Sequence, residues 1–534
     1  MPVRSESHHP AVSQGGAIPA LVESSVGARF RETARRRGNA TALLWEEDDN
    51  LRRLDFMTML GRVESTAARL QQVAAPGDRV ALWAANSVDW ILAEYGAALA
   101  GMVLVPMNPA LTTAEATHII ADSGTRVLLA GPVWRGRDLL GFAQGLEVTP
   151  HPVVLPLEAV TQGDRITPTA LPDVSPESIL RIQYTSGTTG APKGAALNHL
   201  VGANVGPLSH VTIGLDEEDI VCSPLPFHHV GGSVCTSSAA LLRGSAFVVL
   251  PSFEPAATLA LLRRAEVTYF GGVPTMFISM LEACDDSPDL PRLKWMMLGG
   301  SDIAPELITR VERAFGGEIL NGYGQSEAPS AIQTRVGDPA WVKATTIGRV
   351  NPHREVRIAD IGTGKPLGPG VAGELCVRGR LTMGRYWHEN ENRRSGVVDQ
   401  EGWLHTGDLA EMNSDGIVTL RGRLRDLIIR GGENIYPAEV EAVLVQHPAI
   451  AEAAVVAAPD DKWGQVPVAF VRPAAGLPDL AELEEFARER LAGFKVPRDW
   501  RIVESFPLTP SGKVRKVLLA QQLLDQHPVD LPDM

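Results

Sequence analysis

The sequence predicts an α/β protein with a large N-terminal and a small C-terminal domain. In the N-terminal third, Val- and Leu-rich runs at 79–85 and 103–107 flank a stretch, 89–102, with apolar residues at helical spacing. This alternation is typical of parallel sheets covered by helices. A chain of 534 residues is long enough for more than one core. Beyond residue 427, strand and helix patterns form a second compact unit.

The remaining elements follow from local patterns in chain order. A helix is expected over 113–122, where Thr112 or Thr113 can cap its first turn, and a strand over 126–130. The Pro- and Gly-rich stretch 131–176 is predicted to be a winding connection. Further strands are expected at 179–184, 267–273, 294–298, 318–320, 374–379, 416–421, 451–458 and 466–472, and further helices at 274–284, 305–315, 437–446 and 480–491.

Composition narrows the function classes. Hydrophobic residues make up 44% and charged residues 21% of the chain, as in globular proteins in solution. A net charge of −14 argues against a nucleic-acid partner. Four scattered cysteines without a CxxC pair indicate thiols in a reducing compartment. Residues 1–16 do not resemble a signal peptide, and no apolar run has the length of a membrane span, so a cytoplasmic location is expected.

The stretch YTSGTTGAPKG, residues 184–194, carries the strongest chemical signal. Its glycines let backbone N–H groups approach a phosphate, its hydroxyls add donors, and Lys193 adds a positive charge. It is not the common P-loop, because Ala191 and Pro192 separate Gly190 from the lysine, and a proline there argues against a helix start. The alternative is a flexible linker, but a strand leads directly into this loop. The sequence therefore favours a polyphosphate site.

Two later segments offer complementary groups. In 321–327, NGYGQSE, Tyr323 can stack on a purine, Ser326 can donate to phosphate, and Glu327 suits Mg²⁺; read alone, the segment is equally typical of a tight turn. Asp408, in WLHTGD, can accept two hydroxyl donors.

These segments together resemble the adenylate-forming superfamily, which contains acyl-CoA synthetases, adenylation domains of peptide synthetases and beetle luciferases. The resemblance runs from about residue 21 to 522. It implies a β-barrel-like part within the N-terminal domain and a mobile C-terminal domain. The boundary would fall at the charged patch 422–426, giving domains 1–424 and 425–534 with Arg425 as the hinge, although a plain surface turn is the alternative.

The resemblance also implies the nucleotide-binding residues. They are Thr185, Ser186, Gly187, Thr188, Thr189, Gly190, Lys193, Gly299, Gly300, Ser301, Asn321, Gly322, Tyr323, Gly324, Ser326, Asp408 and Arg423. Serine stands at 326 where the family usually has threonine, a mild change. Glu327 and Thr185 would bind the metal. Lys513, in the segment LTPSGKVRK, matches the catalytic lysine, which neutralises charge as a carboxylate attacks the α-phosphate.

The acyl pocket is implied by a further motif, PLPFHHVGG at 224–232. His229 aligns with the histidine at the pocket mouth, and His228 takes the usual aromatic position, so the choice between them stays open. Because neighbours on a strand face opposite sides and no third ligand is near, the pair does not indicate a metal site. Val273, Met276, Gly300 and Gly322 would line the pocket, and Gly271-Gly272 either leave room for ligand or allow close strand packing.

The implied function is an ATP-dependent acid:CoA ligase that uses Mg²⁺. A carboxylate would form an acyl-adenylate and then a thioester with coenzyme A, and the uncharged pocket favours a hydrophobic acid. Gly431, Gly432, Glu433, Trp463 and Phe494 would contact CoA. The rivals are a ligase that acylates a carrier protein's phosphopantetheine, an amino-acid-activating domain, a luciferase-type oxygenase and a non-catalytic nucleotide sensor. A homodimer and a monomer both remain open.

Overall fold

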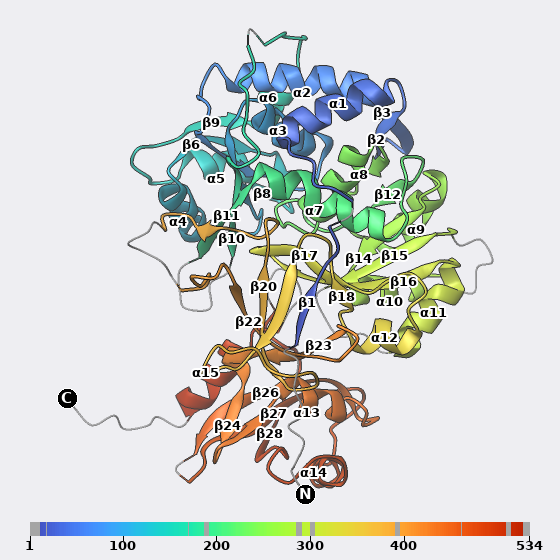
Figure 1. Ribbon diagram of the computed structural model, residues 1–534, viewed down its shortest axis with the longest axis vertical. Coiled ribbons are helices and arrows are strands. Elements are labelled where there is room, and N and C mark those ends of the chain that lie inside the picture. The colour runs from blue at the N-terminus through green and yellow to red at the C-terminus, as the bar shows by residue number, and fades with distance from the viewer. Residues whose placement is uncertain are drawn as a thin grey trace, which may run out of the picture.

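The computed structural model describes residues 11–17, 19–168, 170–185, 192–284, 291–299, 305–389, 396–460, 462–508 and 514–526. Three sheets build the large N-terminal part, and a fourth lies in the C-terminal unit, which forms the lower lobe in Figure 1. The α/β class predicted from the sequence is confirmed. Among the described residues, no helix combines the length and apolarity needed to cross a bilayer.

A seven-stranded sheet carries the hairpin that flanks the glycine-rich loop. Its strands, in spatial order, are β21 (Arg385–Tyr386), β11 (Lys193–Asn198), β10 (Ile179–Thr185), β5 (Val103–Met107), β4 (Arg79–Trp83), β6 (Thr125–Ala130) and β9 (Val153–Pro156). β10, β5, β4, β6 and β9 run parallel, whereas β10 and β11 are antiparallel.

A nine-stranded sheet carries the tyrosine and glutamate of the 321–327 segment. Its order is β18 (Arg349–Val350), β17 (Ala328–Gln333), β16 (Glu318–Gln325), β15 (Trp295–Gly299), β14 (Tyr269–Gly272), β12 (Ile220–Cys222), β13 (Ala246–Val248), β2 (Thr41–Glu47) and β3 (Asn50–Asp55).

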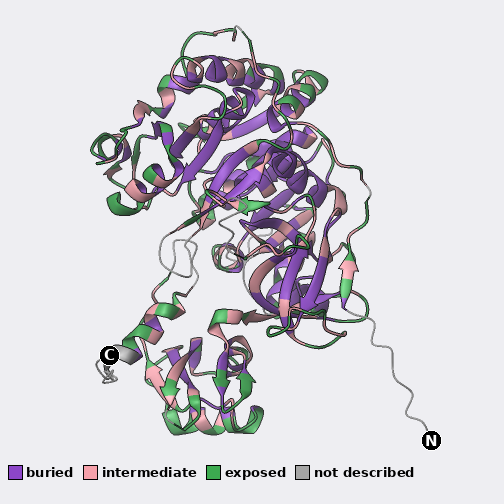
Figure 2. Ribbon diagram, turned by 60° about the vertical axis from the view of Figure 1, so that its left-hand side comes forward, coloured by how far each residue is buried: buried purple, intermediate pink, exposed green. Residues whose placement is uncertain are grey.

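Helices cover and separate these two sheets. They are α1 (Val26–Arg37), α2 (Phe56–Leu70), α3 (Val88–Leu99), α4 (Thr113–Ser123), α5 (Leu139–Gln144), α6 (Leu157–Thr161), α7 (His199–Thr212), α8 (Ser238–Arg243), α9 (Pro255–Arg264), α10 (Pro274–Glu282), α11 (Pro305–Phe315) and α12 (Ala340–Thr345). The largest core joins α1, α2 and α3 to residues of both sheets; Trp90 of α3, for example, lies 5.3 Å from the ring of Phe227. Figure 2 shows this buried interior as continuous.

A five-stranded antiparallel sheet stands where the resemblance implied a barrel-like part. Its order is β1 (Val12–Gln14), β19 (Glu355–Ala359), β20 (Gly373–Arg378), β22 (Leu404–Met412) and β23 (Val418–Arg423). This sheet ends at the short helix η2 (Leu424–Asp426), which leads into the C-terminal unit.

The C-terminal unit packs helices on a small sheet. It contains β24 (Ile428–Arg430), β25 (Glu433–Ile435), α13 (Pro437–Leu444), β26 (Ile450–Asp460), β27 (Gly464–Pro473), α14 (Leu480–Arg490), β28 (Asp499–Ile502) and α15 (Lys516–Gln526). Two apolar clusters stabilise it, one of them centred on Ile428, Val455 and Leu483. The predicted elements of this region are confirmed within a few residues at each end.

Two local predictions are wrong. The stretch 131–176 is not only a connection, because it contains the hairpin β7 (Val133–Trp134) and β8 (Arg137–Asp138), two short helices, and β9, which pairs with β6. The His228-His229 pair does not lie on a strand but in a turn that leads into the π-helix η1 (Ser233–Ser237). Pro224 and Pro226 supply no N–H for a sheet ladder, which explains why the strand ends at Cys222.

Candidate functional site

The glycine-rich loop joins two antiparallel strands of one sheet, as expected for a loop that does not open a helix. Thr185 at the end of β10 pairs with Lys193 at the start of β11, and the Thr185 hydroxyl donates to the Lys193 carbonyl at 3.4 Å. The Lys193 side chain is exposed. The predicted ligands Ser186, Gly187, Thr188, Thr189 and Gly190 lie outside the described residues.

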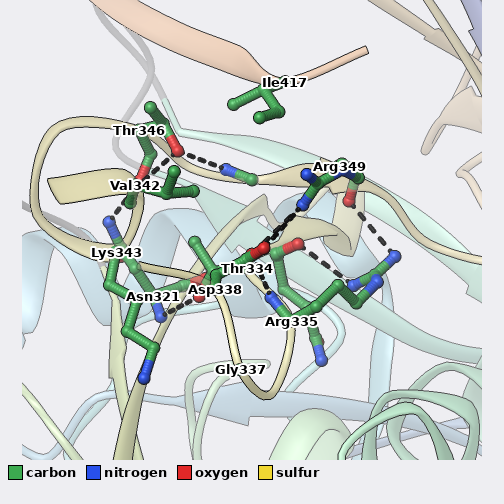
Figure 3. A network of polar contacts seen from close by, with 12 residues as sticks. Asn321, Thr334, Arg335, Gly337, Asp338, Val342, Lys343, Thr346, Arg349 and Ile417 are labelled. Carbon is green, nitrogen blue, oxygen red and sulfur yellow. Dashed lines mark hydrogen bonds and ion pairs between the residues drawn. The ribbon is translucent and has the colours of Figure 1, made fainter. Parts of the chain in front are cut away.

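The segment 321–327, predicted to contact the purine, is mostly strand rather than turn. Residues 321–325 belong to β16, and only Ser326 and Glu327 form the turn into β17. Asn321 is 5% exposed; its side-chain amide donates to the Thr346 carbonyl at 3.0 Å, and its backbone N–H donates to the Thr334 hydroxyl at 2.8 Å (Figure 3). Asn321 therefore fixes the strand that presents the tyrosine. Gly324 is required there, because a Cβ would lie 2.4 Å from the Ser330 nitrogen.

Two predicted residues, Tyr323 and Arg423, contact the carboxylate of a third, Asp408. Asp408 is 7% exposed, accepts a 2.6 Å hydrogen bond from the Tyr323 hydroxyl, and forms a 3.2 Å ion pair with Arg423. Asp408 and Arg423 are direct neighbours in the β22–β23 pairing. Burial, followed by the Asp408 charge, raises the pKa of Tyr323 well above its usual value, so this phenol remains a hydrogen-bond donor.

The loop before Asp408 is held by a second carboxylate. Glu374 of β20 accepts from the backbone N–H of Gly407 at 3.1 Å and from the His405 ring at 2.8 Å. Gly407 has a φ of +70°, a conformation that favours glycine. Together these contacts direct the Asp408 side chain toward Tyr323.

Glu327, the predicted metal ligand, is 6% exposed. Its carboxylate accepts a 2.8 Å hydrogen bond at Oε1 from the Tyr386 hydroxyl, and its carbonyl accepts from the Met383 N–H at 2.7 Å. Tyr386 also lies 5.6 Å from the Lys193 ammonium, measured to the ring centroid. Sequence reasoning missed Tyr386, because an exposed-looking Arg-Tyr-Trp run carries no motif of its own.

A Cβ on Gly271, Gly272, Gly299 or Gly322 would lie 3.3–3.4 Å from its nearest neighbour, so both expectations for the Gly271-Gly272 pair remain predictions. A Cβ on Gly271 would meet the Tyr269 ring at 3.4 Å and the Ser223 hydroxyl at 3.7 Å, and one on Gly272 would meet Met276 sulfur at 3.4 Å. These are near-ordinary contacts with side chains. Gly299 of β15 pairs with Gly322 of β16. A Cβ on Gly299 would lie 3.3 Å from the Gly322 carbonyl oxygen, and one on Gly322 would lie 3.3 Å from the Met297 sulfur. Val273 precedes α10. Gly300 and Ser301 lie outside the described residues.

The two adjacent histidines differ in environment. The His229 side chain is exposed, and its Nδ1 accepts from the Gly231 N–H at 3.2 Å. His228 is half-buried, and burial, with smaller effects of His229 and Arg181, lowers its pKa to about 3. His228 is therefore neutral and the less exposed of the two, and the assignment of either histidine to the mouth of the acyl pocket remains a prediction.

A buried ion pair, also missed from the sequence, lies behind this turn. Arg181 of β10 is fully buried, and its Nη1 contacts Glu94 Oε1 at 3.3 Å and the Ser233 hydroxyl at 2.7 Å, while Nη2 donates to Gln183 at 2.9 Å. Within the described residues, Glu94 Oε2 and Arg181 Nε have no hydrogen-bond partner. Burial, opposed by the Arg181 charge, raises the pKa of Glu94 to about 7.

The ion pair reaches the histidine turn through two neutral side chains. Gln183 donates to the His228 carbonyl at 2.9 Å, and the Ser233 hydroxyl donates to the His229 carbonyl at 3.0 Å. The strand that leads into the glycine-rich loop thus also fixes the backbone of the histidine turn. The signal in the sequence was the pair Arg181 and Gln183, two polar residues on one face of a buried strand.

The residues predicted to contact CoA lie together in the C-terminal unit. Gly431 has a φ of +58°, and a Cβ there would lie 2.7 Å from the Trp463 ring. Arg430 contacts Trp463 at 5.6 Å and donates to the Phe494 carbonyl at 2.6 Å. Gly432 has a φ of +90°, and Glu433 on β25 is exposed.

The predicted catalytic lysine and the predicted hinge lie near the two ends of the C-terminal unit in the sequence. Lys513 lies outside the described residues. Arg425 lies in η2 and forms a 3.5 Å ion pair with its neighbour Asp426. Among the described residues, no hydrogen bond or ion pair links the CoA set to the Tyr323–Asp408–Arg423 cluster. The domain boundary at 424/425 and the role of Arg425 remain predictions.

Two family sequence models match this chain, one in each of its two parts. The sequence model described as AMP-binding enzyme matches residues 30–387, and that of the AMP-binding enzyme C-terminal domain matches residues 439–513. The putative acyl-CoA synthetase YngI of Bacillus subtilis (strain 168) is 32% identical over 543 residues, which cover 95% of this chain and 98% of that protein. The mitochondrial medium-chain acyl-CoA ligase ACSF2 of Bos taurus is 31% identical over 548 residues, covering 95% and 88%.

Among solved structures, the o-succinylbenzoate CoA synthetase MenE of Bacillus subtilis, in complex with its acyl-adenylate intermediate, superposes with a TM-score of 0.82 at 26% identity. The match covers 96% of this chain and 100% of that one. The resemblance seen in the sequence is thereby confirmed over both domains. The chain belongs to the AMP-binding enzyme family, as an ATP-dependent, AMP-forming acyl-CoA synthetase.

Proposed function

We propose that this enzyme activates a carboxylic acid whose acyl group is hydrophobic and carries no further charge. The acyl-adenylate would be held between the histidine turn and the Tyr323–Asp408–Arg423 cluster. The observation that carries the proposal is that cluster, because a buried carboxylate flanked by a phenol and a guanidinium matches the two hydroxyls of a ribose beside a purine. Two members of this cluster, Tyr323 and Asp408, are 85 positions apart in the chain.

The first half-reaction joins the acid to the nucleotide. One carboxylate oxygen attacks the α-phosphorus of ATP, and the bond to the β-phosphate oxygen breaks, releasing pyrophosphate. The exposed ammonium of Lys193 would bind the outer phosphates, and Lys513 would offset the charge that builds at the α-phosphate. No covalent enzyme intermediate is required, so the protein contributes position and charge.

The residues present fit a bound Mg²⁺. Glu327 offers a carboxylate, a hard oxygen ligand, whose Oε1 is held by Tyr386; no donor within the described residues contacts its Oε2. Thr185 adds a hydroxyl at the adjacent strand end. When bound, the ion would neutralise charge on the phosphate oxygens.

The second half-reaction forms the thioester. The sulfur of CoA attacks the acyl carbon, the bond to the adenylate oxygen breaks, and AMP leaves. We assign this step to the face of the C-terminal unit formed by Gly431, Gly432, Glu433, Trp463 and Phe494, with the unit turning about Arg425 between the two steps. The relatives named as CoA ligases favour CoA over a carrier protein as acceptor.

The acid is inferred from the described pocket residues, none of which carries a formal charge when His229 is neutral. Gly271, Gly272, Gly299 and Gly322 carry no side chain that would occupy the pocket, which suits an aliphatic or ring-bearing acid. ACSF2 is named for medium-chain acids, a type that fits this description. A panel of straight-chain, aromatic and dicarboxylic acids, followed by pyrophosphate release, tests it; preference for a dicarboxylic acid would contradict it.

The role of Lys513 has its own test. Lys513→Ala should abolish acid-dependent exchange of labelled pyrophosphate into ATP, yet spare thioester formation from a supplied acyl-adenylate. Lys516→Ala is the matched control, because this nearby lysine is engaged in a 2.6 Å ion pair with Glu441. Intact adenylation in Lys513→Ala would refute the assignment. A cytoplasmic location and a homodimer are further expectations, the latter to be measured by light scattering.

A further inference from the structure

Tyr386 lies where the seven-stranded sheet meets the nine-stranded sheet. It belongs to the two-residue strand β21, which pairs with Ala195 and Ala196 of β11, and Tyr386 itself lies opposite Ala195, two residues after Lys193. Its hydroxyl reaches Glu327, at the turn that follows β16 of the other sheet. One side chain therefore contacts a residue from each of two sheets that no strand pairing joins.

The hydroxyl contact controls the Glu327 carboxylate. That carboxylate is 6% exposed, so water does little to orient it, and the 2.8 Å bond from Tyr386 supplies a donor in place of water. With Oε1 fixed in this way, Oε2 has a defined direction.

The ring contact controls the lysine. The Lys193 ammonium lies 5.6 Å from the centroid of the Tyr386 ring, within the range of a cation–π interaction. The next residue anchors the ring's backbone, because the Trp387 N–H donates to the Gly194 carbonyl at 2.7 Å and the Trp387 indole donates to the Asp122 carbonyl at 3.2 Å. Tyr386 is thus held rigidly against the strand that carries Lys193.

We propose that Tyr386 is a positioning residue that fixes the metal-binding carboxylate of Glu327 relative to the phosphate-binding ammonium of Lys193. Its hydroxyl sets the direction in which Glu327 meets Mg²⁺, and its ring restricts Lys193 to the phosphate side. This inference rests on the proposed function of these two residues. It adds a residue that touches neither substrate nor metal but determines the spacing between two groups that do.

The test separates the metal effect from nucleotide binding. ATP binding to the purified full-length enzyme is measured calorimetrically with EDTA and again with Mg²⁺, and the ratio of the two affinities is the gain due to the metal. In Tyr386→Phe, which keeps the ring, this gain should fall about 10-fold, the lower end of the effect of losing a partner of a metal ligand. Binding in EDTA should match the wild type.

A second variant isolates the ring. Tyr386→Leu should lose the same metal gain and, in addition, bind ATP about two- to fivefold more weakly in EDTA, as expected when an exposed cation–π contact is removed. Tyr436→Phe is the control, because it removes a phenol hydroxyl from the C-terminal unit and changes neither of the two sheets that Tyr386 contacts. Its metal gain should equal that of the wild type. Thermal unfolding of each variant verifies the fold.

The outcomes are distinguishable. A wild-type enzyme with no metal gain would overturn the assignment of Glu327 to Mg²⁺, and the inference with it. A wild-type gain that Tyr386→Phe retains in full would overturn only the inference. An equal loss in Tyr436→Phe would also overturn it, because the effect would then be a general response of the enzyme to a lost hydroxyl.

Discussion

Replacing Arg181 by methionine should destabilise the N-terminal domain by about 3–5 kcal/mol, the usual effect of breaking a buried ion pair. The structure supports this magnitude, because the change removes contacts to Glu94, Ser233 and Gln183 in a fully buried position. Glu94 would be left without its opposite charge, although its raised pKa of about 7 lets it take up a proton near neutral pH.

The double variant Glu94→Met, Arg181→Met gives the sharper result. Glu94 Oε2 and Arg181 Nε have no partner in the described residues, so the pair is incompletely satisfied. Replacing such a pair by apolar side chains is often neutral or stabilising. We therefore expect the double variant to lie within about 1 kcal/mol of the wild type, which makes the coupling free energy of the double-mutant cycle at least about 2 kcal/mol.

The assay is urea unfolding followed by tryptophan fluorescence, with the two single variants and the double variant measured side by side. Trp90 is fully buried one helical turn from Glu94 and reports on this region. Additive free energies of unfolding in the two single variants would refute the reasoning, because the pair would then not act as a unit. The acid KM should rise more than the ATP KM in Arg181→Met, since Gln183 and Ser233 hold the histidine turn.

Three further changes test separate parts of the enzyme. Burial raises the pKa of Glu94 from 4.5 to about 7, so between these pH values the folded protein keeps a proton that the unfolded chain releases. The free energy of unfolding should therefore fall as pH rises through this window. Glu94→Gln should remove this fall, as measured by urea unfolding at several pH values. Asp408→Asn should weaken ATP binding about 10- to 100-fold and abolish the preference for ATP over 2′,3′-dideoxy-ATP; a retained preference would contradict the ribose assignment. Gly431→Ala, at a φ of +58° and 2.7 Å from the Trp463 ring, should slow thioester formation but not pyrophosphate exchange, and equal loss in both half-reactions would argue against a role confined to CoA.

The sequence predicted the fold where periodicity and chemistry agreed. The strand–helix alternation of the N-terminal third gave β4, α3 and β5 within a few residues, and Pro274 marked the start of α10 as expected. The convergence of Tyr323, Asp408 and Arg423 followed from the family resemblance, and the structure brings these side chains within hydrogen-bonding or ion-pair distance.

Errors arose where composition conflicted with tertiary pairing. β9 was missed because its four residues end in Pro156 and lie in a Pro- and Gly-rich stretch, yet pairing with β6 makes it a strand. The segment at 322–324 read as a possible turn because of its glycines, but β15 and β17 hold it extended on both sides. Glycine content alone did not distinguish a turn from a strand whose neighbours leave no space for a Cβ, as at Gly324.

Tyr386 and Arg181 could not be identified from local pattern. Each acts through partners that are distant in sequence: 59 positions separate Tyr386 from Glu327, and 87 separate Arg181 from Glu94. Neither spacing follows from helix or strand periodicity. A polar residue inside an otherwise apolar strand signals a buried partner, but only the packed structure tells which one.

The groups proposed to bind the nucleotide come from three separate sheets: Lys193 from one, Tyr323 and Glu327 from or beside another, and Asp408 and Arg423 from the third. A bound nucleotide would therefore contact all three sheets and stabilise their packing against one another. At a concentration one hundred times its Kd, such a ligand adds about 2.7 kcal/mol to the folded state. Cellular ATP would thus protect variants with weakened contacts between the sheets from degradation. Substitutions far from the reacting atoms would weaken catalysis by changing how the sheets pack against one another.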